Sequence, residues 1–177
     1  MRNLAALLAT AVLLTASSFA LAAPRESNLA TCDDAILGEG PDDWRSRAIT
    51  AGPVSVFKQP LARMTRTKNG LVAKMPMLIR GRAPVTVSVP PPLRGRVFLY
   101  YGRVIGRDGK PTTSVNGARG YGETRFELCQ GRKRTPFPGG IRVRGTEPVR
   151  LTIGVEGETT THTLRLGKPK VYFTPNR

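Results

Sequence analysis

Short apolar runs of the strand type, separated by glycine and proline, constrain the fold of this chain more than any other feature. Val85, Val87 and Val89 alternate with Thr86 and Ser88, as in a strand that buries one face. The chain also holds 19 Gly and 15 Pro, which are scattered between such runs and favour tight turns. The pattern predicts an all-β protein and no convincing helix beyond the N-terminal leader.

Eight such runs are predicted to be strands: 54–57, 71–79, 84–89, 97–101, 124–129, 141–144, 149–155 and 159–166. The run 97–101 is apolar throughout, which predicts a central strand buried on both faces. Asn69-Gly70 predicts a hairpin turn between the polar stretch 63–68 and the run 71–79. Pro76 interrupts that run and predicts an edge strand or a bulge, because proline cannot donate to the ladder.

Eight strands must either stack as two sheets or close into a barrel. We expect an antiparallel immunoglobulin-like β-sandwich of about seven to eight short strands, with a small β-barrel as the alternative. The glycine-rich residues 102–122 are predicted to form one long loop. The expected organisation is a signal peptide (1–22), an irregular lead-in (23–52), the sandwich (53–167) and a C-terminal tail (168–177).

The N-terminus has the pattern of a secretory signal peptide. Arg2 precedes an apolar run from Leu4 to Leu14, and Ala20-Leu21-Ala22 fits the cleavage preference of signal peptidase. The pattern predicts export, to the cell envelope or beyond it, of a 155-residue mature chain, about the size of one domain. No second run reaches the roughly 18 apolar residues of a membrane span, so no integral anchor is expected. A lipoprotein box ending at Cys32 is the alternative, although residues 24–28 separate it from the apolar run.

The mature chain has two cysteines, Cys32 and Cys129. An even pair in an exported protein is most simply one disulfide. The alternative is two free thiols, with Cys129 buried in a strand and Cys32 exposed.

Several segments together resemble a family of secreted or surface proteins from actinobacteria and related high-GC bacteria. They are residues 52–56, 74–79, 85–90, 97–102, 126–129, 138–140 and 149–155. The resemblance implies a β-rich exported domain; the family has no assigned activity, so it implies no functional residue. The family pattern also implies a cysteine just before Val149, where this chain has Glu147-Pro148. That departure leaves Cys32 as the one available partner for Cys129.

No motif in the sequence predicts a catalytic site, a metal site or a cofactor. The single histidine, His162, lies in a predicted strand without a local nucleophile or acid, so we interpret it as structural. The acidic pairs Asp33-Asp34 and Asp42-Asp43 lack the spacing of a calcium loop. Gly109-Lys110 is followed by proline instead of Ser or Thr, so the phosphate-binding loop pattern fails.

Positive charge is the feature that carries functional weight. The chain has 28 Lys and Arg against 12 Asp and Glu, a net charge of +16, which becomes +15 when the leader with Arg2 is removed. Such a charge attracts polyanions with an affinity that falls as salt rises. The candidate contact residues are Arg132, Lys133, Arg134, Arg142 and Arg144. Arg142 and Arg144 alternate with Ile141 and Val143, so we expect both to project from one exposed sheet face. A high-GC genome and solubility would explain the same composition without any ligand.

The sequence therefore favours a non-enzymatic, exported β-sandwich that acts as a cell-envelope binding or structural module. Anionic envelope polymers and lipid headgroups are the expected partners. Nucleic acid is not expected, because single-strand binding needs exposed aromatic side chains among basic residues. Tyr100 and Tyr101 lie in the most apolar strand, Phe126 alternates inward, and export separates the chain from the genome. The alternative is a secreted hydrolase whose site is formed by the 102–122 loop and the acidic lead-in.

Overall fold

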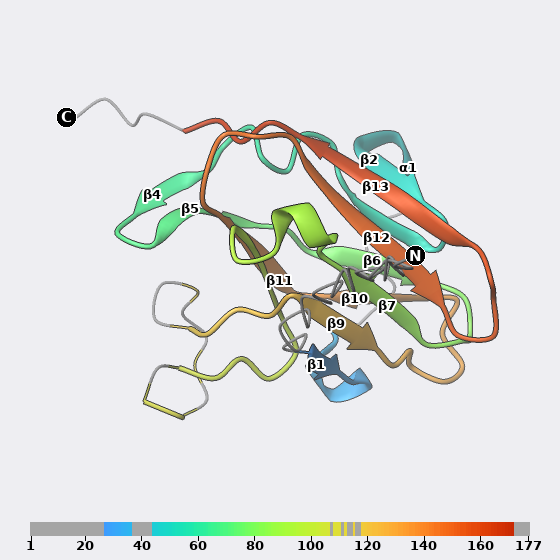
Figure 1. Ribbon diagram of the computed structural model, residues 1–177. Coiled ribbons are helices and arrows are strands. Elements are labelled where there is room, and N and C mark those ends of the chain that lie inside the picture. Colours follow the sequence, from blue (N-terminus) through green and yellow to red (C-terminus); the bar gives the residue numbers. More distant parts are fainter. Residues whose placement is uncertain are drawn as a thin grey trace, which may run out of the picture.

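The computed structural model describes residues 27–36, 44–106, 108–110, 112, 115 and 118–171 (Figure 1). The predicted signal peptide and the acidic residues Asp42 and Asp43 lie outside them. The strands are β1 (Ser27–Ala30), β2 (Ala48–Ala51), β3 (Val54–Phe57), β4 (Thr65–Thr67), β5 (Gly70–Lys74), β6 (Met77–Arg80), β7 (Val85–Ser88), β8 (Val97–Tyr101), β9 (Glu123–Phe126), β10 (Arg134–Phe137), β11 (Gly139–Val143), β12 (Val149–Val155) and β13 (Thr161–Gly167). The short helical turns are η1 (Cys32–Asp34), α1 (Trp44–Arg47) and η2 (Pro91–Leu93).

The described strands form three open sheets, so the fold is an all-β sandwich and not a closed barrel. The first sheet has the order β1-β9-β7-β12-β13, the second β10-β6-β3-β2 and the third β4-β5-β11-β8. All pairs are antiparallel except β1 with β9. The long strands β12 and β13 run side by side, and the β4–β5 hairpin projects away from them (Figure 1).

The second and third sheets are two halves of one long ladder. β10 pairs with β6, and β11 pairs with β5, in the same register. That register places Pro138 opposite Pro76 at the point where both strands are interrupted. Neither proline has an N–H to donate, so the ladder breaks there and resumes where the Met75 amide donates to the Gly139 carbonyl.

One apolar cluster joins the three sheets. It includes Val56, Val87, Leu99, Phe126 and Ile153, all fully buried. Alternation along each strand delivers these side chains to the same interior, as the sequence pattern predicts.

An aromatic group lies inside this core. The rings of Phe126 and Tyr101 meet edge to face with centroids 5.3 Å apart, and Phe137 lies 4.9 Å from Phe126. The Tyr101 hydroxyl donates to the Met75 carbonyl. Burial raises the pKa of Tyr101 well above its ordinary value, because the phenolate would lose its hydration.

All eight predicted strand regions contain strands, and the described residues of the predicted loop, 102–122, contain none. β3, β8 and β12 have the expected bounds, and the hairpin at Asn69-Gly70 is confirmed, with Thr67 paired to Gly70. The run 71–79 is broken near Pro76, as predicted, but both halves are internal strands; the edge assignment was wrong. The prediction that 97–101 is a central strand was also wrong, because β8 ends its sheet. Among the described residues, an isolated bridge from Leu99 to Tyr121 lies beyond it.

Four strands were not predicted: β1, β2, β4 and β10. The lead-in is therefore not irregular throughout, because β1 and β2 each join a sheet. β1 pairs with the distant strand β9, whereas β2 forms a hairpin with β3, in which Ala51 is opposite Val54. Ser27, Asn28 and Thr50 give no clear alternation of apolar and polar residues that would have predicted either strand. The predicted tail also contributes, since Val171 forms a parallel bridge with Met64.

The predicted disulfide is confirmed. Cys32 and Cys129 are bonded, with Cα atoms 5.0 Å apart. The bond follows β1 by two residues and therefore ties this added strand to the end of β9. The Asn28 side-chain amide donates to the Tyr101 carbonyl at 2.5 Å and attaches β1 to the end of β8 as well.

Candidate functional site

A basic hollow lies next to the disulfide, between two turns that the strands bring together. The turn after β6 supplies Gly81 and Arg82, and the segment from β9 to β10 supplies residues 128–133. Gly81 and Gly131 have φ angles of 116° and 75°, which side chains rarely adopt, so glycine suits both turns. We call this hollow of about 590 Å³ the basic pocket.

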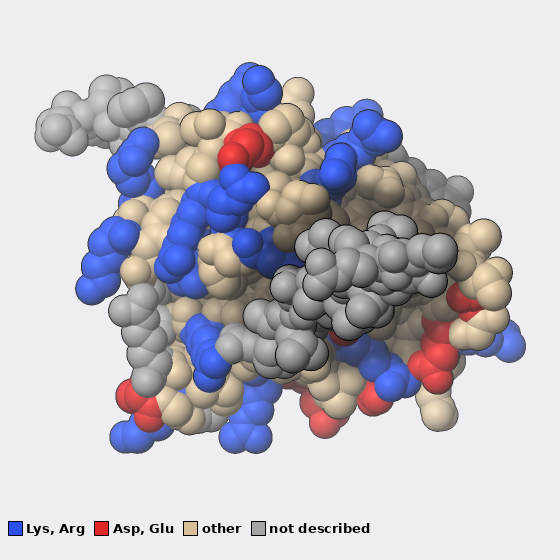
Figure 2. Space-filling view, in the orientation of Figure 1, with Lys and Arg blue, Asp and Glu red and all other residues tan. Residues whose placement is uncertain are grey.

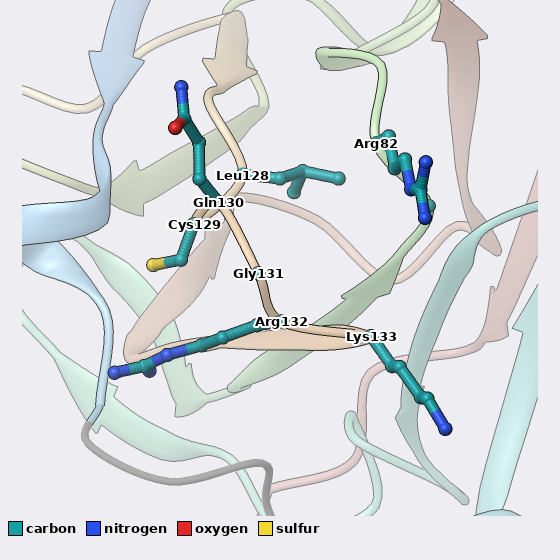
Figure 3. Close-up of a pocket in the computed structure, with 8 residues that line it drawn as sticks. Arg82, Leu128, Cys129, Gln130, Gly131, Arg132 and Lys133 are labelled. Atoms are coloured by element: carbon teal, nitrogen blue, oxygen red, sulfur yellow. The ribbon is translucent and has the colours of Figure 1, made fainter.

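The side chains of the basic pocket surround it instead of converging on one point. Leu128 points toward Arg82 across the hollow, while Arg132 and Lys133 leave the Gly131 turn in opposite directions (Figure 3). Arg132 donates from Nη1 to the Ile36 carbonyl at 3.2 Å, which holds its guanidinium along the rim. Such a rim offers positive charge to several points of a long ligand.

The charged side chains among the described residues that line the basic pocket are all positive. Arg82, Arg132 and Lys133 line it, and none of the described residues that line it is Asp or Glu. The nearby turn η1 carries Asp34, whose Oδ2 accepts from the Thr31 amide at 2.8 Å. That carboxylate caps its own turn and does not line the pocket.

Arg134, the third residue of the predicted basic triplet, has a different position. It lies in β10, directly opposite Arg80 of β6. Arg80 donates from Nη2 to the Ser55 hydroxyl at 3.0 Å. The triplet is therefore contiguous in sequence, but only Arg132 and Lys133 line the pocket.

Arg142 and Arg144 occupy another part of the molecule, where they line a hollow whose described residues do not include Arg132 or Lys133. Alternation places both on the same outer face, as predicted, with Arg142 in β11 and Arg144 directly after it. However, the expectation that both are exposed was wrong, because Arg142 is only 4% exposed. The segment after β8 covers the Arg142 side chain. Alternation along one strand does not show that another segment covers its outer face, so the sequence did not predict the burial of Arg142.

His162, the single histidine considered for catalysis, has a structural position. His162 packs against Gly52, where an added Cβ would lie 2.4 Å from the ring. The imidazole also lines a small hollow with Arg80, Arg82 and Glu158. Within the described ranges, no group of three or more His, Cys, Asp and Glu side chains is placed to hold a metal ion.

Comparison with protein-family models and with curated proteins finds no match to the chain. The likeness to secreted high-GC bacterial proteins therefore remains a prediction. In the part of the chain that the structure describes, no helix has the length and apolar character to cross a membrane. The disulfide indicates that the domain matures in an oxidising, extracytoplasmic environment.

Sequence reasoning missed Arg82 as a member of the site. Arg80, Gly81 and Arg82 form a basic turn between two apolar runs, and that composition was the available signal. Only the register of β6 against β10 shows that this turn faces the 128–133 segment.

Proposed function

We propose that this protein is a non-enzymatic binding module of the cell envelope, which holds anionic polymers through the basic pocket. The observation that supports it is the pocket rim, where Arg82, Arg132 and Lys133 surround a lining without carboxylates among its described residues. Multivalent contact of this kind gives salt-dependent affinity without a tightly fitted ligand. Phosphate-bearing wall polymers and acidic polysaccharides have the matching charge.

The wider surface supports the same proposal. Lys and Arg side chains greatly outnumber Asp and Glu on the displayed face, above all over the β4–β5 hairpin (Figure 2). Two ion pairs, Arg96 with Glu147 and Arg125 with Glu156, neutralise part of this charge. With a net charge of +16, most of the positive field still remains to attract an anionic polymer.

The test is binding of the mature domain to immobilised heparin and to long-chain polyphosphate at increasing salt. The triple variant Arg82→Ser, Arg132→Ser, Lys133→Ser removes the charge of the rim. Three screened contacts at the surface contribute about 0.2–1 kcal/mol each, so the Kd should rise ~3- to 150-fold. The variant should also elute at clearly lower salt.

The matched control removes the same charge elsewhere. Arg150, Arg165 and Lys168 are exposed on or beside β12 and β13, and the triple Ser variant at these positions should have a much smaller effect. Equal losses in the two triple variants would reject the basic pocket as the contact site, because only net charge would then matter. Unchanged binding in both would reject the proposal altogether.

A further inference from the structure

The outer face of the β8–β11 pair carries a second arrangement of arginine and aromatic side chains. Arg142 is the cross-strand partner of Phe98, and Gly140 is the partner of Tyr100. Because side chains alternate, Phe98, Tyr100 and Arg142 lie on the face opposite the core residues Leu99 and Ile141. The small residue at Gly140 leaves room for its neighbours on that face.

Arg142 is held in place by the two rings. Its Cζ lies 4.7 Å from the centroid of Phe98 and 5.2 Å from that of Tyr100. Arg144 approaches the same Phe98 ring at 5.3 Å. Ring faces attract guanidinium groups, and a guanidinium stays charged even when buried. The guanidinium groups of Arg142 and Arg144 therefore both pack on the ring of Phe98, which together with the ring of Tyr100 we call the aromatic support.

The segment after β8 forms the other wall. Gly106 bridges to Ala118, and the Arg119 amide donates to the Ile105 carbonyl at 2.9 Å. Gly120 lies so close to Phe98 and Tyr100 that an added Cβ would be within 2.7 Å of both. This contact brings the segment over the aromatic support and leaves a hollow beside it.

We call this hollow the arginine pocket; it has a volume of about 520 Å³. Arg119, Arg142 and Arg144 line it, with Phe98 and Ile105 as apolar walls. None of the described residues that line it is Asp or Glu, and none also lines the basic pocket. The volume is in the range of small-molecule sites and exceeds what a bare inorganic ion fills.

We infer that the arginine pocket binds a sugar-sized molecule that carries one phosphate or carboxylate group. Guanidinium groups donate in a planar fork that matches the oxygens of either group. The burial of Arg142 strengthens this attraction because little water screens it. The apolar walls contact the remainder of the ligand. The site is distinct from the polymer-binding rim and does not depend on the proposed function.

The test titrates the isotope-labelled mature domain with glucose, glucose 6-phosphate and glucuronate, with amide NMR shifts as the readout. Glucose 6-phosphate, glucuronate or both should shift the amides of Gly106, Gly109 and Gly120, with a Kd at least ~10-fold lower than that of glucose. The stronger of the two identifies the anionic group. Equal binding of glucose, no saturable binding of either anion, or shifts confined to Gly81 and Gly131 would overturn the inference.

Variants at the rim avoid the risk of unfolding that a buried Arg142 substitution carries. Arg119 and Arg144 are exposed, and their double Gln variant should weaken anion binding at least ~5-fold while the melting temperature stays within a few degrees. Unchanged affinity would overturn the inference. Two measurements distinguish the arginine pocket from the basic pocket: heparin retention, which reports polymer binding, and anion binding by the triple Ser variant of the basic pocket. That triple variant should leave binding of the small anions intact, whatever its effect on polymers.

Discussion

Removal of the Cys32–Cys129 disulfide should cost more stability than most single core substitutions. The two cysteines are 97 residues apart in sequence, so the bond closes a loop that spans more than half of the chain. In the unfolded state this closure removes many conformations that an open chain would explore. The loss of stability in a variant without the bond should therefore come mainly from the unfolded ensemble.

The chain-entropy relation gives the magnitude. For a loop of this length it predicts about 4.7 kcal/mol at 25 °C. For a domain of this size, each kcal/mol corresponds to roughly 2–4 °C in melting temperature, which gives a decrease of about 10–20 °C. The m-value should rise at the same time, because the open unfolded chain exposes more surface.

Urea unfolding of the Cys32→Ala, Cys129→Ala variant measures both quantities. Wild-type protein in reducing agent is the matched control, because it keeps both side chains and loses only the bond. Both samples should lose a similar amount of free energy and show a higher m-value. A loss below about 1 kcal/mol with an unchanged m-value would refute the entropic argument.

Two further predictions concern the aromatic core. Phe126→Ala should lower the free energy of unfolding by about 3–5 kcal/mol in urea, because it leaves a cavity between Tyr101 and Phe137; Phe126→Leu should cost clearly less, and equal costs would contradict the cavity explanation. Above pH ~10 the unfolded chain loses the Tyr101 proton that the folded state keeps, so stability should fall by up to about 1.4 kcal/mol per pH unit as pH rises. The stability that the protonated Tyr101 contributes is fully present below pH ~10. In the Tyr101→Phe variant the free energy of unfolding, measured in urea between pH 9.5 and 11, should therefore decline less steeply with pH than in the wild type. Equal slopes in the two proteins would contradict a raised pKa of Tyr101.

Local alternation made the central strands predictable. In β7 and β12 every second residue is apolar and buried, except that Val155 at the end of β12 is only partly buried. Alternation with a period of two therefore identifies both the strand and its inner face. β10 was missed because Pro136 and the charged residues before it resemble a loop. Its pairing with β6 is set by the ladder that continues from β11, which no local pattern contains.

The candidate sites were predictable only in part. The sequence identified the basic residues but could not group them, since Lys133 and Arg144 lie eleven positions apart and line different pockets. Arg82 lines the same pocket as Lys133 because the pairing of β6 with β10 brings its turn next to the 128–133 segment. Arg142 was expected at the surface because alternation distinguishes two faces but does not show that another segment covers the outer one.

The attachment of β1 has a consequence for handling and for quality control of the protein. β1 covers the outer edge of β9, and the sulfur bridge holds it there. An uncovered sheet edge is a template for pairing with another chain. Newly made protein whose thiols have not yet been oxidised would keep that edge less securely shielded, so timely oxidation protects the molecule against self-association as well as against unfolding.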